Sequence, residues 1–91
     1  MIHVENLDGP TARVVAWDGG PSVTVACGGS RTVGPQGAPS LPWHLTVYDA
    51  SSGRVLFSHT VTGTIYLIIR SDRVLWGDQP GNGGPVPGGC H

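Results

Sequence analysis

Thiolate and imidazole groups are the side chains of this sequence that could bind a metal. A zinc or copper site could draw on Cys27, His44, His59, Cys90 and His91. Their spacing includes no C-x-x-C and no pair of histidines at ligand distance. We therefore expect no metal site and no cofactor. The alternative is a small-ligand or metal-binding β domain that uses His44, His59 and Cys27.

The two cysteines, Cys27 and Cys90, raise the question of a disulfide. An oxidised pair would close a long loop and stabilise a small domain. Cys27, however, continues an apolar row formed by Val23 and Val25, a position typical of a buried thiol. The first residues also show no secretory leader, so we expect both thiols to be reduced.

Catalytic motifs are incomplete in this chain. Residues 28–32 read G-G-S-R-T and match a nucleophile elbow except at Thr32, where glycine is needed. Residues 29–34 have the glycine spacing of a phosphate-binding loop, but Pro35 and Gln36 stand where lysine and a hydroxyl residue should follow. All five basic residues are arginine, which removes lysine chemistry. We expect that the protein is not an enzyme.

Charge and hydropathy bear on partners and location. The 91 residues carry a net charge of -1, which provides no basic field for nucleic acid or for an anionic membrane. No apolar run approaches the length of a membrane span. We expect a cytoplasmic or virion-associated protein. The absence of lysine is associated with GC-rich genomes and indicates a bacterium or its phage.

The distribution of glycine and proline determines the fold class. The chain has 15 Gly and 8 Pro, and the longest stretch without either, residues 64–76, is 13 residues long. Valine, isoleucine and threonine are abundant, and their β-branched side chains suit a pleated sheet. Both observations favour an all-β fold with little room for a helix.

Alternation of apolar and polar residues locates the strands. The clear candidates are 11–17, 22–27, 43–49, 54–61, 64–70 and 73–76, with 2–7 as a weaker candidate and a short strand conceivable at 31–33. Six or seven short strands with turn residues between them predict a small antiparallel β-sandwich with an immunoglobulin-like layout. A small β-barrel is the alternative. We assign residues 1–76 to this single domain and residues 77–91 to a flexible Gly/Pro-rich tail.

Surface recognition is the function that this pattern favours. The faces opposite the core rows carry His44, Thr46 and Tyr48 on one strand and Tyr66, Ile68 and Arg70 on another, and neighbouring strands would join them into one patch. The long loop 28–42 is a second candidate binding element. We expect a non-catalytic module for protein–protein interaction or structural assembly, with a protein partner or by self-association. The candidate binding residues are Arg31, Gln36, His44, Tyr48, Tyr66 and Arg70.

Overall fold

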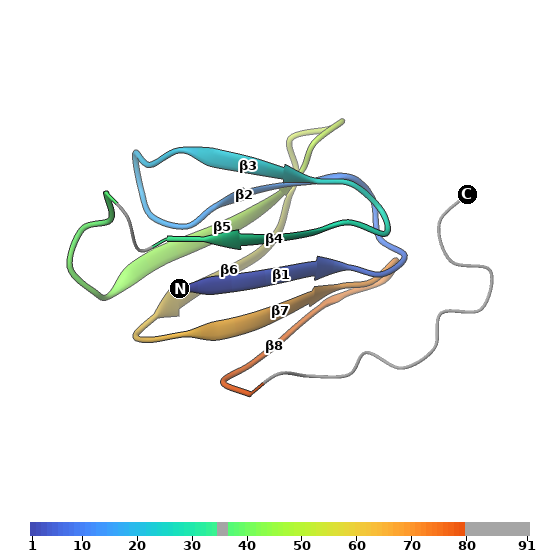
Figure 1. Cartoon of the computed structure of the whole chain (residues 1–91). Helices are drawn as coiled ribbons and strands as arrows, with labels where there is room; N and C mark the ends of the chain where they lie inside the picture. Colours follow the sequence, from blue (N-terminus) through green and yellow to red (C-terminus); the bar gives the residue numbers. More distant parts are fainter. Residues whose placement is uncertain (35–36, 80–91) are drawn as a thin grey trace.

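The computed structural model describes residues 1–34 and 37–79 and shows an all-β chain (Figure 1). Its eight strands are β1 (Ile2–Asn6), β2 (Ala12–Val15), β3 (Ser22–Val25), β4 (Ser30–Val33), β5 (Trp43–Asp49), β6 (Val55–Val61), β7 (Ile65–Ile69) and β8 (Val74–Gly77). The described residues contain no helix, and hence none with the length and hydropathy that crossing a membrane requires.

The strands form two four-stranded sheets. The first sheet has the order β4-β1-β7-β8 and the second has the order β3-β2-β5-β6. All pairings are antiparallel except that of β1 with β7, which is parallel. β1 therefore lies between the edge strand β4 and the central strand β7, as Figure 1 shows. The chain crosses between the sheets after β1, β3, β4 and β6.

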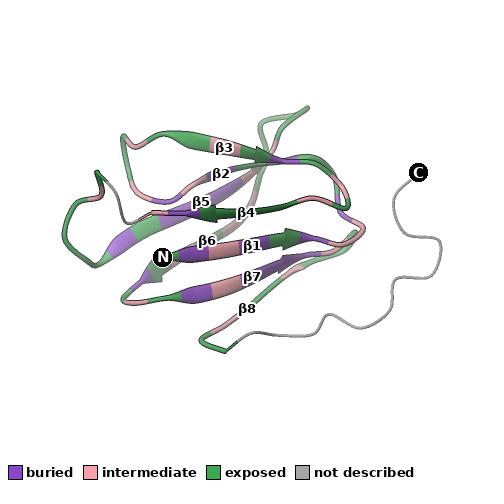
Figure 2. Ribbon diagram, viewed as in Figure 1, coloured by how far each residue is buried: buried purple, intermediate pink, exposed green. Residues whose placement is uncertain are grey.

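The hydrophobic core lies between the two sheets in a sandwich-like layout. Each sheet contributes one face of alternating residues, which appears as the purple segments along the strands in Figure 2. Ile2 and Leu67 come from the first sheet, while Val14, Leu45 and Val47 come from the second, and none of them is more than 1% exposed. Burial of such side chains is the main favourable contribution to folding.

The predicted all-β class is confirmed and the layout is sandwich-like, but β1 and β7 pair in parallel rather than antiparallel, and the predicted number of strands is too low. The structure has eight strands where six or seven were expected, because 2–6 and 30–33 are both complete strands that pair with each other. The loop predicted at 28–42 therefore contains β4. No pairing among the described residues joins the two sheets, so they do not close into the alternative barrel.

The proposed domain boundary falls at the last strand. β8 ends at Gly77, one residue beyond the expected end of the domain at Trp76. The predicted tail, residues 77–91, lies outside the described residues from position 80 onward. The division into domain and tail stays a prediction.

Candidate functional site

The single patch predicted from strands 43–49 and 64–70 is not formed. His44 and Tyr48 on β5 and Tyr66 on β7 all point outward, as the alternation predicts. β5, however, belongs to the second sheet and β7 to the first, because the chain crosses between the layers after β6. The outward faces of two packed sheets lie on opposite sides of the molecule. The predicted residues therefore belong to two separate surfaces.

The outward surface of the second sheet is here called the Arg13–Tyr48 face. It comprises Arg13, Val15, Thr24, His44, Thr46, Tyr48 and Ser58. The Arg13 guanidinium lies over the Tyr48 ring, 4.6 Å from its centroid. His44 places Nδ1 3.2 Å from Asp18 Oδ1 and Nε2 2.9 Å from Ser58 Oγ. The charged and aromatic groups of this face thus contact one another.

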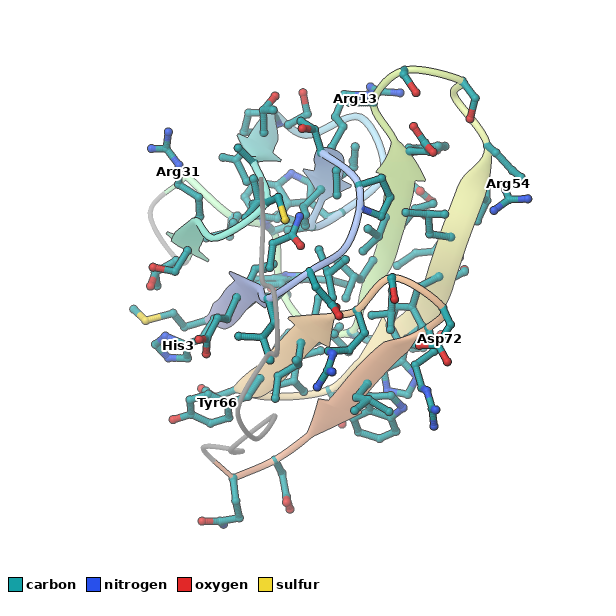
Figure 3. All side chains as sticks on the ribbon, turned by 90° about the vertical axis from the view of Figure 1, so that its right-hand side faces the viewer. His3, Arg13, Arg31, Arg54, Tyr66 and Asp72 are labelled. Carbon is teal, nitrogen blue, oxygen red and sulfur yellow. The ribbon has the colours of Figure 1, made fainter. Side chains whose placement is uncertain are left out.

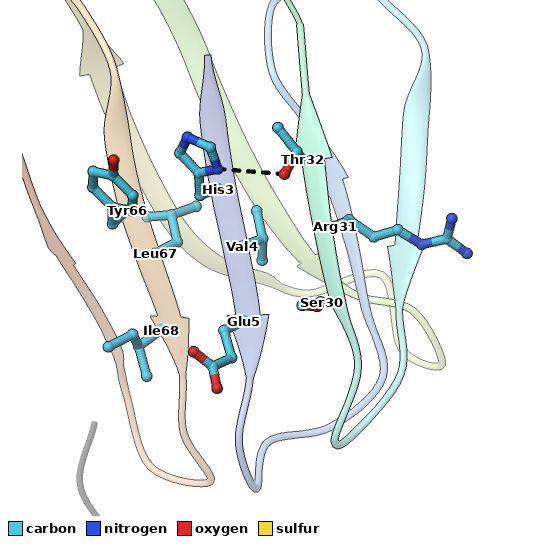
Figure 4. Close-up of a pocket in the computed structure, with 9 residues that line it drawn as sticks. All are labelled: His3, Val4, Glu5, Ser30, Arg31, Thr32, Tyr66, Leu67 and Ile68. Atoms are coloured by element: carbon cyan, nitrogen blue, oxygen red, sulfur yellow. Dashed lines mark hydrogen bonds between the residues drawn. The ribbon is translucent and has the colours of Figure 1, made fainter. Parts of the chain in front are cut away.

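The outward surface of the first sheet is here called the His3–Tyr66 face. It is a regular array of two rows that cross β4, β1 and β7: Thr32, His3 and Tyr66 in one row, and Ser30, Glu5 and Ile68 in the other. These residues line a hollow of about 550 Å³, which is shown in close-up in Figure 4. Figure 3 shows that His3 and Tyr66 lie side by side, far from Arg13.

An aromatic stack forms the first row of this array. The rings of His3 and Tyr66 are nearly parallel, with an interplanar angle of 11° and 4.6 Å between centroids. Nδ1 of His3 lies 3.3 Å from Oγ1 of Thr32, so the imidazole contacts a neighbour on each side. The parallel register of β1 and β7 places His3 directly opposite Tyr66 and thereby positions the stack.

A carboxylate with no cationic partner among the described residues occupies the second row. Glu5 is exposed on a strand with neighbours on both sides, flanked by Ser30 and by Ile68, which is only 8% exposed. No cationic group of the described residues lies within 4.0 Å of its carboxylate, since the ion pairs join other residues. Arg31 also lines the hollow, but its side chain points away from Glu5 (Figure 4).

The remaining predicted binding residues have different surroundings. Arg70 follows β7 and donates from Nε to Oδ1 of Asp8 at 3.0 Å, with only 24% of its side chain exposed. The same Oδ1 accepts the N–H of Ser71 at 2.9 Å. Arg70 thus connects the turn after β1 to the turn after β7. Gln36 lies outside the described residues.

The sequence reasoning missed His3, Glu5 and Thr32. The period-2 pattern of the N-terminal segment places Ile2 and Val4 inward and His3 and Glu5 outward, so their exposure was readable from the sequence. Their proximity to Tyr66 was not, because it depends on a parallel pairing between the two ends of the chain. Arg13, the partner of Tyr48, was missed because their contact depends on the antiparallel pairing of β2 with β5.

The structure does not assemble the alternative site of His44, His59 and Cys27. His44 points outward from the second sheet, whereas His59 pairs with the inward-facing Leu45 and packs 4.0 Å from the Trp76 ring. The described residues hold no group of three His, Cys, Asp or Glu that could bind a metal ion. The two imidazoles therefore lie on opposite faces of one sheet and do not converge.

Cys27 differs from its expected state. It follows the end of β3 at Val25, is half-buried, and its Sγ lies 3.9 Å from the carbonyl oxygen of Leu7. No cysteine among the described residues is free, and Cys27 is disulfide-bonded. The predicted reduced thiol is thus wrong, and a sulfur in a disulfide supplies neither a thiolate ligand nor a nucleophile. Cys90, the other cysteine, lies outside the described residues.

Exposed apolar side chains lie on the edge strands β6 and β8 of the two sheets. Trp76 is 50% exposed, and Leu75 and Val55 are also exposed. The rings of Phe57 and His59 lie 6.0 Å apart, and His59 is tilted against Trp76. Trp43, by contrast, is only 4% exposed and belongs to the core. Trp76 is the tryptophan that remains accessible to a partner.

Comparison with known proteins does not supply a function for this chain. No family model matches the sequence, and no curated protein or solved structure matches it either. What the protein does must therefore be inferred from the chemistry of the described side chains, above all those of the His3–Tyr66 face.

Proposed function

We propose that the protein is a non-catalytic module that binds a protein partner through the His3–Tyr66 face. The observation that carries this proposal is the array itself, in which a stacked His3 and Tyr66 pair lies beside the carboxylate of Glu5, which has no cationic partner among the described residues. Tyrosine is enriched among the residues that contribute most to binding. The role in structural assembly, in a bacterium or its phage, belongs to the same proposal.

The two sheet faces differ in how much interaction they leave to a partner. On the Arg13–Tyr48 face, the guanidinium already covers the tyrosine ring, and both nitrogens of His44 have partners. On the His3–Tyr66 face, the carboxylate of Glu5 has no partner among the described residues. Complementary charge increases the specificity of association. The His3–Tyr66 face therefore has more to gain from a bound partner.

The same geometry favours binding over catalysis. His3 and Thr32 are an imidazole and a hydroxyl in proximity, but their 3.3 Å separation exceeds the usual range for a nucleophile and its base. A catalytic base is also oriented by a third group, and no described group is hydrogen-bonded to Nε2 of His3. The pair therefore contributes to a recognition surface, which needs neither feature.

The immunoglobulin-like layout also remains a proposal. Two sheets of short and mostly antiparallel strands packed around one core support it. The strand order differs in detail: the four-stranded sheet of an antibody constant domain has the chain order 1-2-5-4, whereas the orders here are 3-2-5-6 and 4-1-7-8.

An affinity capture with matched surface variants tests this function. The full chain is immobilised as wild type, as His3→Ser/Tyr66→Ser, and as Arg13→Ser/Tyr48→Ser, and each is exposed to lysate of the organism that encodes it. We expect wild type and the second variant to retain the same protein partner and the first variant to lose it. Retention by His3→Ser/Tyr66→Ser, or the absence of any partner, would contradict the proposal.

Sedimentation over a wide concentration range tests the self-association form of the same function. If the partner is a second copy of the chain, wild type forms a defined oligomer and His3→Ser/Tyr66→Ser stays monomeric. An oligomer that survives in this variant and is lost in Trp76→Ser would instead assign the interface to the exposed Trp76.

A further inference from the structure

We propose that the partner inserts a guanidinium side chain into the hollow of the His3–Tyr66 face, where it pairs with Glu5 and lies against the Tyr66 ring. This inference rests on the proposed function and specifies the chemistry that the face recognises. It commits to a protein partner whose interacting segment presents an arginine.

The first step of the argument is the charge of Glu5. Glu5 is exposed on β1, a strand with neighbours on both sides. Its carboxylate lies beside the nearly buried Ile68, with no described cation within 4.0 Å. A partner that covers this face takes the carboxylate out of water. An unpaired buried charge costs several kcal/mol, whereas a paired and hydrogen-bonded one does not carry the full cost. A stable complex therefore requires a cation opposite Glu5.

The second step is the aromatic surface beside that charge. Tyr66 is half-buried and stacked on His3, so its ring is held in place before any partner arrives. A cation near a tyrosine ring gains attraction from the negative potential of the ring face. The chain uses this chemistry on its other surface, where Arg13 lies 4.6 Å from the Tyr48 centroid. Tyr66 offers the same kind of ring, and no arginine of the described residues lies over it.

The third step distinguishes guanidinium from ammonium. A guanidinium is planar, can lie flat against an aromatic ring, and has five N–H donors arranged to meet a carboxylate in two places. The hydroxyl of Ser30, directly opposite Glu5 on β4, is a further acceptor beside the carboxylate, whereas Oγ1 of Thr32 is already 3.3 Å from Nδ1 of His3. An ammonium is compact and strongly hydrated and cannot make this combination of contacts. Arginine is therefore the better fit.

Charge also argues against an anionic partner. The Glu5 carboxylate repels a phosphate or an acidic peptide that approaches the hollow, and Arg31, the arginine at its border, points away from it (Figure 4). The chain as a whole carries a net charge of -1. Both observations are consistent with a basic segment as the ligand.

An NMR titration of the full ¹⁵N-labelled chain with N-acetyl-arginine amide tests the inference. We expect amide shifts at the two rows of the array, with a dissociation constant in the millimolar range, and N-acetyl-citrulline amide should bind at least about tenfold more weakly because it lacks the charge. Equal binding of the two compounds, or no shift at this face up to the solubility of the arginine probe, overturns the inference.

Variants connect the probe to the named side chains. Glu5→Gln removes the charge from an exposed position and should weaken the arginine probe by about tenfold or more, while Asp18→Asn, an exposed carboxylate that contacts His44 of the other sheet, should leave it unchanged. Circular dichroism establishes that both variants are folded. An unchanged affinity in Glu5→Gln, or shifts that map to Asp18 and His44, overturns the inference.

The captured protein separates a failure of this inference from a failure of the proposed function. If Glu5→Gln loses the partner that wild type retains, both the proposed function and this inference are supported. If Glu5→Gln keeps the partner and His3→Ser/Tyr66→Ser loses it, the face binds a partner but recognises no cation, and only this inference fails. If His3→Ser/Tyr66→Ser also keeps the partner, the proposed function fails with it.

Discussion

The backbone N–H of Gly9 donates a hydrogen bond of 2.9 Å to Oδ1 of Asn6, a side chain that is completely buried. The amide nitrogen of the same asparagine donates to the carbonyl oxygens of Pro10 at 2.8 Å and Val25 at 3.1 Å. Asn6 ends β1 in the first sheet and Val25 ends β3 in the second. One side chain therefore connects the two layers where the chain crosses between them.

Replacement of Asn6 is expected to be strongly destabilising. Asn6→Leu removes one acceptor and two donors at once, which leaves the Gly9 N–H and the carbonyls of Pro10 and Val25 without those bonds. A buried group left unpaired costs about 1 to 3 kcal/mol, so we expect the free energy of unfolding to fall by about 2 to 5 kcal/mol. Urea denaturation followed by circular dichroism measures this change.

Thr60→Val serves as the control for that measurement. Thr60 is exposed on β6, and an exposed substitution of this kind changes stability by about 0.5 kcal/mol or less. A loss in Asn6→Leu no greater than in Thr60→Val would mean that the buried amide does not hold the layers together.

Gly9 provides a second prediction at the same crossing. A Cβ at this position would lie 2.5 Å from Cγ2 of Ile69 and 3.0 Å from the carbonyl oxygen of Arg70. Ile69 is the buried last residue of β7 and Arg70 follows it, so Gly9→Ala must displace side chain and backbone together. We expect it to lower the free energy of unfolding by about 1 to 3 kcal/mol, as overpacking typically does.

Gly63→Ala is the matched control for Gly9→Ala. A Cβ at Gly63 would meet no atom within 4 Å, so this substitution only restricts the unfolded chain and is expected to leave stability unchanged or raise it by up to about 1 kcal/mol. Thermal and urea denaturation of the two variants, measured side by side, should separate them. Equal stabilities of the two variants would show that the turn after β1 accommodates the extra Cβ with no loss of unfolding free energy.

The fold class was predictable because it depends on local pattern. In the segment 43–49, period-2 alternation assigns Trp43, Leu45 and Val47 to the core, and all three are buried. The same pattern is present in 2–6, where Ile2 and Val4 are buried, although it spans only five residues. Short strands of this kind look weak in a sequence because their stability comes from pairing partners rather than from their own residues.

The candidate site was less predictable because it depends on pairing across the chain. Alternation assigns Tyr48 and Tyr66 correctly to outward faces, but it carries no information about which sheet each strand joins. His3 meets Tyr66 through a parallel register between residues more than 60 positions apart. Local residue types do not encode such a contact, since it follows from the order in which the strands are arranged.

The last prediction concerns pH and the turn that joins β5 to β6. The hydroxyl of Ser51 donates a hydrogen bond of 2.7 Å to Oδ1 of Asp49, and the backbone N–H groups of Ser51 and Ser52 donate to the same oxygen at 2.9 and 3.3 Å. These bonds favour the charged carboxylate and lower the pKa of Asp49 below its ordinary value. The largest effect comes from the hydroxyl of Ser51.

A lowered pKa in the folded state determines the sign of the pH dependence. The charged form of Asp49 is favoured in the folded chain over the unfolded chain, so its contribution to stability is fully present above the unfolded pKa of about 3.9. It is lost as the pH falls through the lower pKa of the folded state. The difference in unfolding free energy between wild type and Asp49→Asn should therefore be largest near neutral pH and shrink in acid below about pH 4.

Ser51→Ala isolates the physical cause of this effect. The variant keeps the carboxylate and both backbone donors but removes the hydroxyl, so the pKa of Asp49 should move back toward its ordinary value. Carboxyl chemical shifts recorded by NMR across an acid titration measure that pKa directly. If the titration of Asp49 is the same in wild type and in Ser51→Ala, the backbone N–H groups of the turn, rather than the serine hydroxyl, stabilise the charge.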